Sequence, residues 1–246
     1  MTHYHGTPIT PSVAAAHIMA GRHAMVSYAH PEQVELMFDC CQSVSFDNGA
    51  FSAWRAGKPI KDWHPYYLWV KEWMHHPSFD FALIPDIIDG SERDNDTQIS
   101  IWGLGKQVGC PIWHLHESLH KLENLCNYWP RVAIGSSGDY AVIGTPSWWD
   151  RMSEAMETAC PFGWPKAKLH GLRMLDTDIF TKFPFSSADS TNVARNVGMD
   201  RAWKGPYEPA TKAGRGVVIA ERIEAFQSAA RWVSIETQQG LFTEAQ

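Results

Sequence analysis

The sequence has few cysteines, and it shows neither a long apolar stretch nor the residue pattern expected of a secretion signal. Its five cysteines are odd in number, and no two of them have the spacing Cys-x-x-Cys. This argues against a disulfide framework and against a cysteine-rich structural zinc site. No apolar run reaches the roughly 18 residues that a membrane span needs. The first residues also lack a basic stretch followed by an apolar core. We therefore expect a cytoplasmic protein that does not contact a membrane.

An excess of positive charge is missing as well. The 27 Asp and Glu residues outnumber the 21 Lys and Arg residues, which gives a formal net charge of −6. This balance argues against a small basic nucleic-acid-binding module, but it is compatible with a large fold that carries one local basic face. The sequence has neither a Walker nor a dinucleotide-binding glycine motif. It also lacks the Gly-x-Ser-x-Gly elbow of many serine hydrolases.

Short apolar runs alternate with longer helical patterns along the chain. This alternation is typical of a parallel α/β sheet, and the 246 residues are close to the roughly 250 of a (β/α)₈ barrel. We therefore predict a single-domain TIM-like (β/α)₈ barrel over residues 1–246, with residues 216–234 as a strand that runs into an amphipathic helix and forms the eighth unit. The other predicted strands are 24–28, 43–46, 81–84, 111–115, 131–134, 167–170 and 183–186, and the predicted helices are 62–75, 92–108, 119–129, 148–159 and 176–182.

Four predicted strands are followed by residues that can carry chemistry. Asp47, Asp86 and Asp189 each come at or just after a strand, and residues 135–138 (GSSG) follow another. Taken singly, each is explained by a helix cap or a tight turn. In a parallel barrel, however, the C-terminal ends of the strands meet at one mouth. Together they predict a shared site in which clustered carboxylates differ in protonation.

These motifs resemble those of tRNA-guanine transglycosylases. Residues 46–51 (FDNGAF) resemble the DSGGFQ stretch of that family, residues 133–136 (AIGS) its AIGG stretch, and residues 168–172 (KLHGL) its YLMGV stretch. Asp189, with Arg195-Asn196 after it, resembles the nucleophilic Asp that precedes an Arg-Asn pair. The short transglycosylase-like proteins of phages and of 7-deazaguanine DNA modification are the most similar branch. The resemblance runs from about Val44 to Asn196.

The sequence departs from the family in several places. No cysteine follows Cys160, so we expect the family's zinc subdomain to be absent. Ala50, Ser52 and Ser136 stand where the family has Gly, Gln and Gly. The family's Gln on the middle strand has no clear counterpart, and His114, His116 or Glu117 could take its place. These departures leave open which nucleic acid is the substrate and which base enters.

The resemblance implies an exchange of bases through a covalent intermediate. Asp189 would attack C1′ of a target deoxyguanosine and expel guanine. Asp47 would act as general acid and base for the leaving and entering bases. The entering base would be a free 7-deazaguanine of the preQ type. No cofactor and no metal ion are expected.

The same resemblance implies how the base is held. Asp86 would accept hydrogen bonds from the guanine-type edge, and backbone groups of Gly135 and Ser136 would bind the substituent at position 6. Phe51 and His170 would sandwich the base. The resemblance also places Gly49, Gly171, His114 and His116 at this substrate site.

Residues 190–216 are locally basic, with five basic against two acidic side chains. This stretch predicts contact with a phosphate backbone just after Asp189. The residues expected to touch nucleic acid are Asn192, Arg195, Arg201, Lys204, Lys212 and Arg215. DNA is the expected substrate and tRNA is less favoured. The target base has to leave its stack, or be presented in a single strand, to reach such a pocket.

Three alternatives stay open at this point. One is a metal-dependent barrel hydrolase that uses His114, His116 and an Asp, because alternate residues of a strand share a face. Another is a module that binds a modified base or nucleic acid without catalysis. The third is a transglycosylase that acts on tRNA. A homodimer, or a partner protein that delivers DNA, is compatible with each of them.

Overall fold

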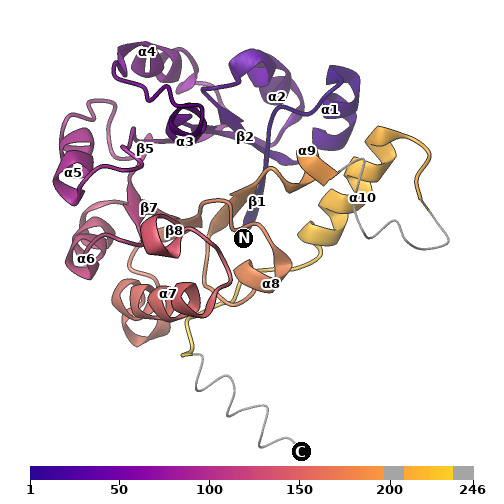
Figure 1. Cartoon of the computed structure of the whole chain (residues 1–246). Helices are drawn as coiled ribbons and strands as arrows, with labels where there is room; N and C mark the ends of the chain where they lie inside the picture. The colour runs from indigo at the N-terminus through magenta and orange to yellow at the C-terminus, as the bar shows by residue number, and fades with distance from the viewer. Residues whose placement is uncertain (197–207, 235–246) are drawn as a thin grey trace, which may run out of the picture.

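The computed structural model describes residues 1–196 and 208–234 (Figure 1). Within them, all strands belong to one parallel sheet in the order β5-β4-β3-β2-β1-β9-β8-β7-β6. Helices surround this sheet, as expected for a barrel-like α/β fold. The strands are β1 Thr2–Gly6, β2 His23–Ser27, β3 Ser43–Asp47, β4 Phe79–Leu83, β5 Gly109–Cys110, β6 Ile112–His114, β7 Arg131–Gly135, β8 Lys168–Gly171 and β9 Ser187–Ser190.

The sheet nearly closes on itself at Pro111. Only this residue separates β5, which pairs with β4, from β6, which pairs with β7. Proline has no backbone N–H to give to a ladder, but the carbonyl of Pro111 accepts a hydrogen bond from the backbone N–H of Ala133 at 2.9 Å. The barrel-like α/β fold expected from the sequence is confirmed. The expected strand count of eight differs, because the proline divides one extended segment into two of the nine strands.

The helices lie outside the sheet and between successive strands (Figure 1). Polar residues begin several of them: Ser91, Ser118 and Thr145 each accept a backbone N–H from the first turn of α5, α6 and α7. The α-helices are α1 Ser12–Met19, α2 Val34–Cys40, α3 Ala50–Arg55, α4 His64–Trp73, α5 Glu92–Ser100, α6 Leu119–Tyr128, α7 Pro146–Ala159, α8 Thr177–Phe180, α9 Asn192–Asn196 and α10 Lys212–Glu224. The 3₁₀ helices are Pro31–Gln33, Gly138–Tyr140 and Pro161–Gly163.

Two apolar clusters fill the fold. The larger one lies between the sheet and the helices, and the smaller one consists of side chains from the strands: Tyr4, Met25, Phe81, Leu83, Cys110, Ile112 and Ala133. Alternate residues of a strand face opposite sides of a sheet, so β2, β4, β6 and β7 each contribute side chains to both clusters. Near the starts of β3 and β4, the Tyr4 hydroxyl donates to Asp80, and Arg131 pairs with the same carboxylate. These polar contacts and the ring of Phe81 fill one end of the barrel.

The predicted eighth unit is wrong. Residues 217–219, expected in a strand, lie inside α10, because their apolar side chains recur at a spacing that also suits a helix face. Two strands were not predicted: β1, whose sequence THYHG lacks an apolar run, and the two-residue β5. The run at 183–186 precedes β9 instead of forming it. Within residues 1–196 and 208–234, no helix is both long and apolar enough to cross a membrane.

Candidate active site

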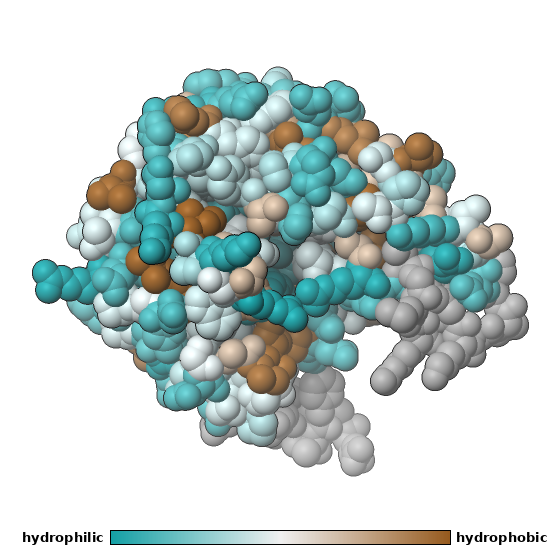
Figure 2. Space-filling view, turned by 45° about the horizontal axis from the view of Figure 1, so that its top comes forward, coloured by the Kyte–Doolittle hydropathy of each residue, from teal (hydrophilic) through white to brown (hydrophobic). Residues whose placement is uncertain are grey.

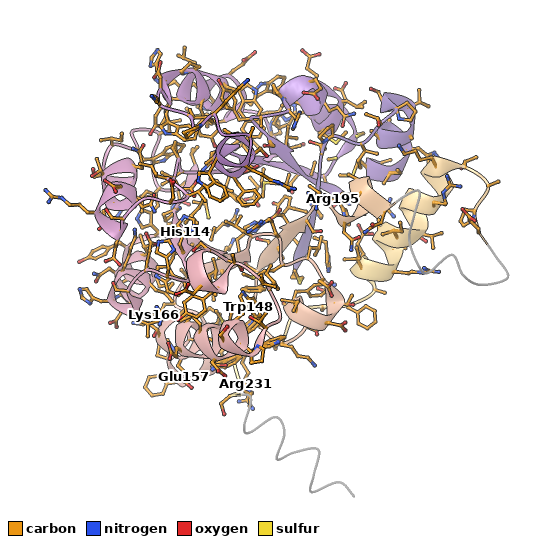
Figure 3. The ribbon with its side chains drawn as sticks, viewed as in Figure 1. His114, Trp148, Glu157, Lys166, Arg195 and Arg231 are labelled. Carbon is orange, nitrogen blue, oxygen red and sulfur yellow. The ribbon has the colours of Figure 1, made fainter. Side chains whose placement is uncertain are left out.

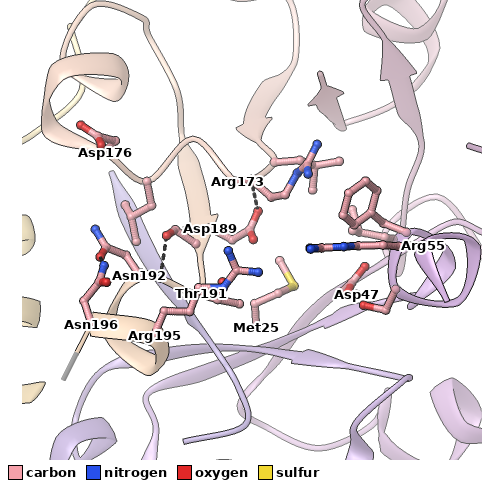
Figure 4. Close-up of a pocket in the computed structure, with 16 residues that line it drawn as sticks. Met25, Asp47, Arg55, Arg173, Asp176, Asp189, Thr191, Asn192, Arg195 and Asn196 are labelled. Carbon is pink, nitrogen blue, oxygen red and sulfur yellow. Dashed lines mark hydrogen bonds between the residues drawn. The ribbon is translucent and has the colours of Figure 1, made fainter. Parts of the chain in front are cut away.

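A cavity of about 520 Å³ opens where β2, β3 and β9 end and where the loop after β8 begins. Asp47 and Asp189 lie on opposite walls of it, and the side chains of Arg55 and Arg195 point into the space between them (Figure 4). A second cavity of about 60 Å³ shares Asp47, Phe51 and Arg173 with the first and extends to Asp86, His114, Gly135 and Ser136. The two cavities therefore form one site with a wide outer part and a narrow inner part.

The surface of the molecule is hollowed near the centre of one view, and hydrophilic side chains border much of this hollow (Figure 2). In the stick view, His114 and Arg195 lie on opposite sides of the barrel, whereas Glu157, Lys166 and Arg231 lie toward its edge (Figure 3). His114 comes from β6 and Arg195 from α9. The functional candidates are thus drawn from strands and helices distant in sequence.

Asp47 is the last residue of β3, and its environment favours the protonated form. Burial, together with the charges of Asp189 and Asp86, raises the pKa of its carboxyl from 3.8 to about 6, against the lowering effect of the hydrogen bonds from Ser27 and Gly49. Its Oδ1 accepts the backbone N–H of Gly49 at 3.3 Å. A carboxyl with a pKa near 6 can both give and take a proton close to neutral pH. Asp47 is therefore suited to acid–base work.

Asp189 lies in β9 and is held on one side. Its Oδ1 accepts the backbone N–H of Arg173 at 2.9 Å, and Nε2 of His170 lies 3.3 Å from the same oxygen. Nδ1 of His170 in turn lies 2.8 Å from Oγ of Ser187. These contacts fix the orientation of a carboxylate that lines the outer cavity. A carboxylate oriented in this way can attack an electrophilic carbon.

His170 does not take the place that the sequence predicts for it. Its side chain is 0% exposed, and it packs edge-on against Tyr4 and Phe81. A ring so enclosed cannot stack on a base. His170 supports Asp189 instead, because β8 and β9 are neighbours and turn both side chains to the barrel interior.

Asp86 forms the polar end of the inner cavity. Its Oδ1 accepts Nδ2–H of Asn48 at 2.8 Å, and its Oδ2 lies 2.9 Å from Nε2 of His114. Asn48 also donates to the carbonyl of Ile84 at 2.9 Å, which fixes the amide. Each carboxylate oxygen has two acceptor sites, so Asp86 can still accept hydrogen bonds from a ligand in the inner cavity.

Two of the predicted glycines have structural roles. Gly49 begins α3 with φ +78°, a conformation that other residues rarely adopt. A Cβ on Gly171 would lie 2.9 Å from the ring of Phe185, so this glycine permits close packing. Neither lines the two cavities. Gly135 does line the inner cavity, next to Ser136, whose hydroxyl accepts the indole N–H of Trp148 at 2.9 Å.

His116 lies outside both cavities. Its ring stacks on that of His114 with centroids 5.7 Å apart, and its Nδ1 lies 2.6 Å from Oγ of Ser137. Across the residues that the structure places, no three His, Cys, Asp or Glu side chains lie close enough together to hold a metal ion. The metal-dependent hydrolase, which needs such a ligand set, therefore has no support in this part of the chain.

The predicted nucleic-acid residues divide into three groups. Asn192 and Arg195, on α9, line the outer cavity. Lys212 and Arg215 lie on α10 and do not line it, and Arg215 lies 3.5 Å from Glu208 and donates to the carbonyl of Pro209. Arg201 and Lys204 fall outside the described residues. The structure thus brings only part of the basic stretch to the site.

Sequence reasoning missed two arginines of the outer cavity, Arg55 and Arg173. Arg55 ends α3, the helix that follows Asp47, so its position after the FDNGAF motif was an available signal. Arg173 follows β8 with φ +58°, a conformation that nothing in its residue type suggests.

Comparison of the chain with protein-family models, with curated proteins and with solved structures finds no match.

Proposed function

We propose that this protein exchanges guanine in a nucleic acid strand for a 7-deazaguanine base, with DNA as the favoured substrate. The observation that carries the proposal is that one site holds two carboxylates of different environment, Asp47 and Asp189, beside a narrow polar recess that ends at Asp86. The arginines around the outer part suit a substrate that carries phosphates.

The first half of the reaction breaks the bond between the sugar and guanine. An oxygen of Asp189 attacks C1′ of the target nucleotide, and the bond between C1′ and N9 of guanine breaks. Asp47 gives its proton to the leaving base, so guanine departs neutral and Asp47 becomes a carboxylate. The strand stays intact and is joined to Asp189 through an ester at C1′.

The second half reverses these steps with a different base. The ionised Asp47 takes the proton from N9 of the entering 7-deazaguanine, and N9 attacks C1′ while the ester bond to Asp189 breaks. Both carboxyl groups return to their starting states, and no oxidant, reductant or metal ion is consumed. A single residue can act as acid and then base in this manner only if its pKa is near the working pH, as that of Asp47 is.

The inner cavity suits the recognition of a guanine-type edge. The carboxylate of Asp86, fixed by Asn48 and His114, is an acceptor for the N1–H and 2-amino groups. Gly135 and Ser136 lie across the same recess, where a small side chain lets a ligand approach the backbone. Discrimination follows because a base without these donors leaves Asp86 without partners for its remaining acceptor sites.

The test is a nucleoside analysis with matched variants. Wild type, Asp189→Asn and Asp178→Asn are each incubated with a 7-deazaguanine base and with double-stranded DNA, single-stranded DNA or tRNA. The nucleic acid is then digested and the nucleoside masses are read. Asp178 is an exposed carboxylate on α8 outside the cavity, so Asp178→Asn controls for the loss of one negative charge.

The expected result is a 7-deazaguanine deoxynucleoside with wild type and Asp178→Asn, and a loss of at least about 10³-fold with Asp189→Asn. A product in tRNA alone overturns DNA as the substrate and keeps the chemistry. Release of guanine without insertion shows hydrolysis and overturns base exchange. No reaction with any nucleic acid, in a folded protein, overturns the proposed function.

A further inference from the structure

Arg173 has an unusual backbone and an unusual position. It is one of two non-glycine residues with positive φ in the described chain, at +58°. This conformation costs about 1–2 kcal/mol for an ordinary residue, and such strain tends to persist where function needs it. Its backbone N–H binds Oδ1 of Asp189 at 2.9 Å. The strained turn therefore serves the proposed nucleophile and also aims the side chain into the site.

The guanidinium of Arg173 occupies the stacking surface of Phe51. Its Cζ atom lies 4.2 Å from the centroid of that ring, and its Nη2 donates to the carbonyl of Ser136 at 3.2 Å. Phe51 and Ser136 both line the inner cavity, and Arg173 lines the inner and the outer cavities alike. A flat cation that stacks on a ring and donates to a carbonyl makes the contacts that a flat base would make there.

The outer cavity holds three arginines beside the carboxylates of Asp47 and Asp189. Arg55, Arg173 and Arg195 line it, and none of them forms an ion pair with another residue of the described chain. The pKa of Arg173 is lowered, first by desolvation and also by the charge of Arg195, against the raising effect of Asp189 and Asp47. Arg195 repels an outward-turned Arg173 while the two carboxylates attract it, so a phosphate that binds Arg195 would remove the unfavourable contribution.

We infer that Arg173 is a specificity residue that fills the base slot on Phe51 in the free protein and leaves it when a phosphate of the substrate strand enters the outer cavity. The inference rests on the proposed function, because it takes the slot to be a base site. Arg173 is exposed, so its side chain can turn without a change in the fold. Its backbone, and hence its N–H to Asp189, stays in place.

This arrangement couples the two ligands of the site. A phosphate offers Arg173 a charge-assisted partner in the outer cavity, and the vacated surface of Phe51 then admits the base. A ligand shifts such an equilibrium only through its different affinity for the two states. The strand therefore strengthens binding of the free base, and by reciprocity the base strengthens binding of the strand. The protein would bind a free base weakly until it holds its strand.

The test measures base affinity with and without a strand that contains no guanine. Isothermal titration of a 7-deazaguanine base is carried out on wild type, Arg173→Gly and Lys182→Ala, each alone and saturated with oligothymidylate. Glycine accepts a positive φ and keeps the backbone N–H to Asp189, so Arg173→Gly removes the side chain alone. Lys182 is exposed and precedes β9, so Lys182→Ala controls for the loss of one positive charge.

With wild type and Lys182→Ala, the oligonucleotide should tighten base binding about five- to tenfold. With Arg173→Gly, the base should bind about equally with and without the oligonucleotide, and in its absence at least about threefold tighter than to wild type. Weaker base binding by Arg173→Gly, or an unchanged gain from the oligonucleotide, overturns the role of Arg173 alone. If no protein binds a guanine-type base under either condition, the proposed function itself is overturned.

Discussion

At the residue scale, the surroundings of the Asp47 carboxyl group suit acid–base chemistry but lower the stability of the folded protein at neutral pH. Asp47 titrates near pH 6 because burial and the charges of Asp189 and Asp86 disfavour its ionised form. In the unfolded chain the same group returns to its ordinary value of about 4. The folded protein therefore has to hold an ionised Asp47 at neutral pH at a cost in stability, which is typical of functional sites.

We predict that Asp47→Asn stabilises the protein at neutral pH. Between pH 4 and 6 the folded wild type binds more protons than the unfolded chain, so stability falls as pH rises through this window and stays reduced above it. Asparagine does not titrate and escapes this loss. The variant should gain about 1–3 kcal/mol at pH 7.5, and the gain should shrink toward pH 5. Urea denaturation at pH 5, 6, 7 and 8 measures the difference.

The control for this prediction is Asp39→Asn, an exposed carboxylate of α2. Its stability relative to wild type should not vary over the same range of pH. A gain for Asp47→Asn that is equal at pH 5 and pH 8 would show that Asp47 does not titrate between them. In that case its role as general acid and base would lose its physical support.

At the element scale, the strands that the sequence predicted share one property. Each contains buried apolar side chains, adjacent to one another in β2, β4, β6 and β7 and isolated in β3 and β8, because strands of a parallel sheet are buried on both faces. β1 and β9 are polar and were missed or misplaced. In β1, His3 and His5 bond to the carbonyl of Phe226 and the carboxylate of Glu224. These hydrogen-bond partners lie more than 200 positions away in the sequence and allow the polar side chains of β1 to be buried. No local sequence pattern indicates such partners.

The candidate site, like the strands, was predictable only in part from the sequence. Asp47 and Asp86 come at or just after the ends of predicted strands, and Asp189 lies close behind another, where barrel geometry brings functional groups together. The position of Arg173 at the site depends on its backbone conformation and on its contact with Phe51. Neither can be predicted from the residue type. The observed role of His170 differs from the predicted one for a related reason. Its burial depends on neighbours from β1 and β4.

The turn between β3 and α3 gives a prediction about one glycine. A Cβ on Gly49 would lie 2.8 Å from the backbone nitrogen of Ala29, and φ is +78°. Gly49→Ala should therefore destabilise the protein by about 2–4 kcal/mol, through backbone strain and a clash that displaces α3. Gly57 has φ +69° but open space around its Cβ position, so Gly57→Ala should cost only the backbone strain, about 1–2 kcal/mol.

Chemical denaturation of the two glycine variants separates strain from steric clash. Because α3 carries Phe51 and Arg55, a displaced helix should also weaken base binding in Gly49→Ala but not in Gly57→Ala. Equal losses of stability in both variants would mean that the turn yields easily. The close contact with Ala29 would then play no part in holding α3 over the cavity.

At the scale of the whole molecule, helix α10 connects the outer layer to the strands near the site. It packs against α1 and α9, and α9 carries Asn192 and Arg195 of the outer cavity. At the last residue of α10, the carboxylate of Glu224 lies 2.8 Å from Nε2 of His5, and its two oxygens share the Nε–H of Arg22, at 3.0 and 3.1 Å. One side chain thus ties α10 to β1 and to the segment before β2.

We predict that Glu224→Gln loosens this connection and lowers the thermal midpoint by several degrees. Burial would raise the pKa of Glu224, but the hydrogen bonds and charges of His5 and Arg22 outweigh it and hold that pKa below its ordinary value. The stabilisation is therefore present above about pH 4.5 and is lost as pH falls further. Removing the charge from this half-buried group should cost about 1–3 kcal/mol at pH 7, or roughly 2–4 °C for each kcal/mol in a chain of this size.

Glu221→Gln is the matched control, since that exposed carboxylate lies 4.0 Å from Arg22 and should contribute less than about 0.5 kcal/mol. Calorimetry of both variants at pH 7 and pH 4 should show a large deficit for Glu224→Gln at pH 7 that narrows at pH 4. Equal midpoints for the two variants at pH 7 would mean that α10 is held by its apolar face alone.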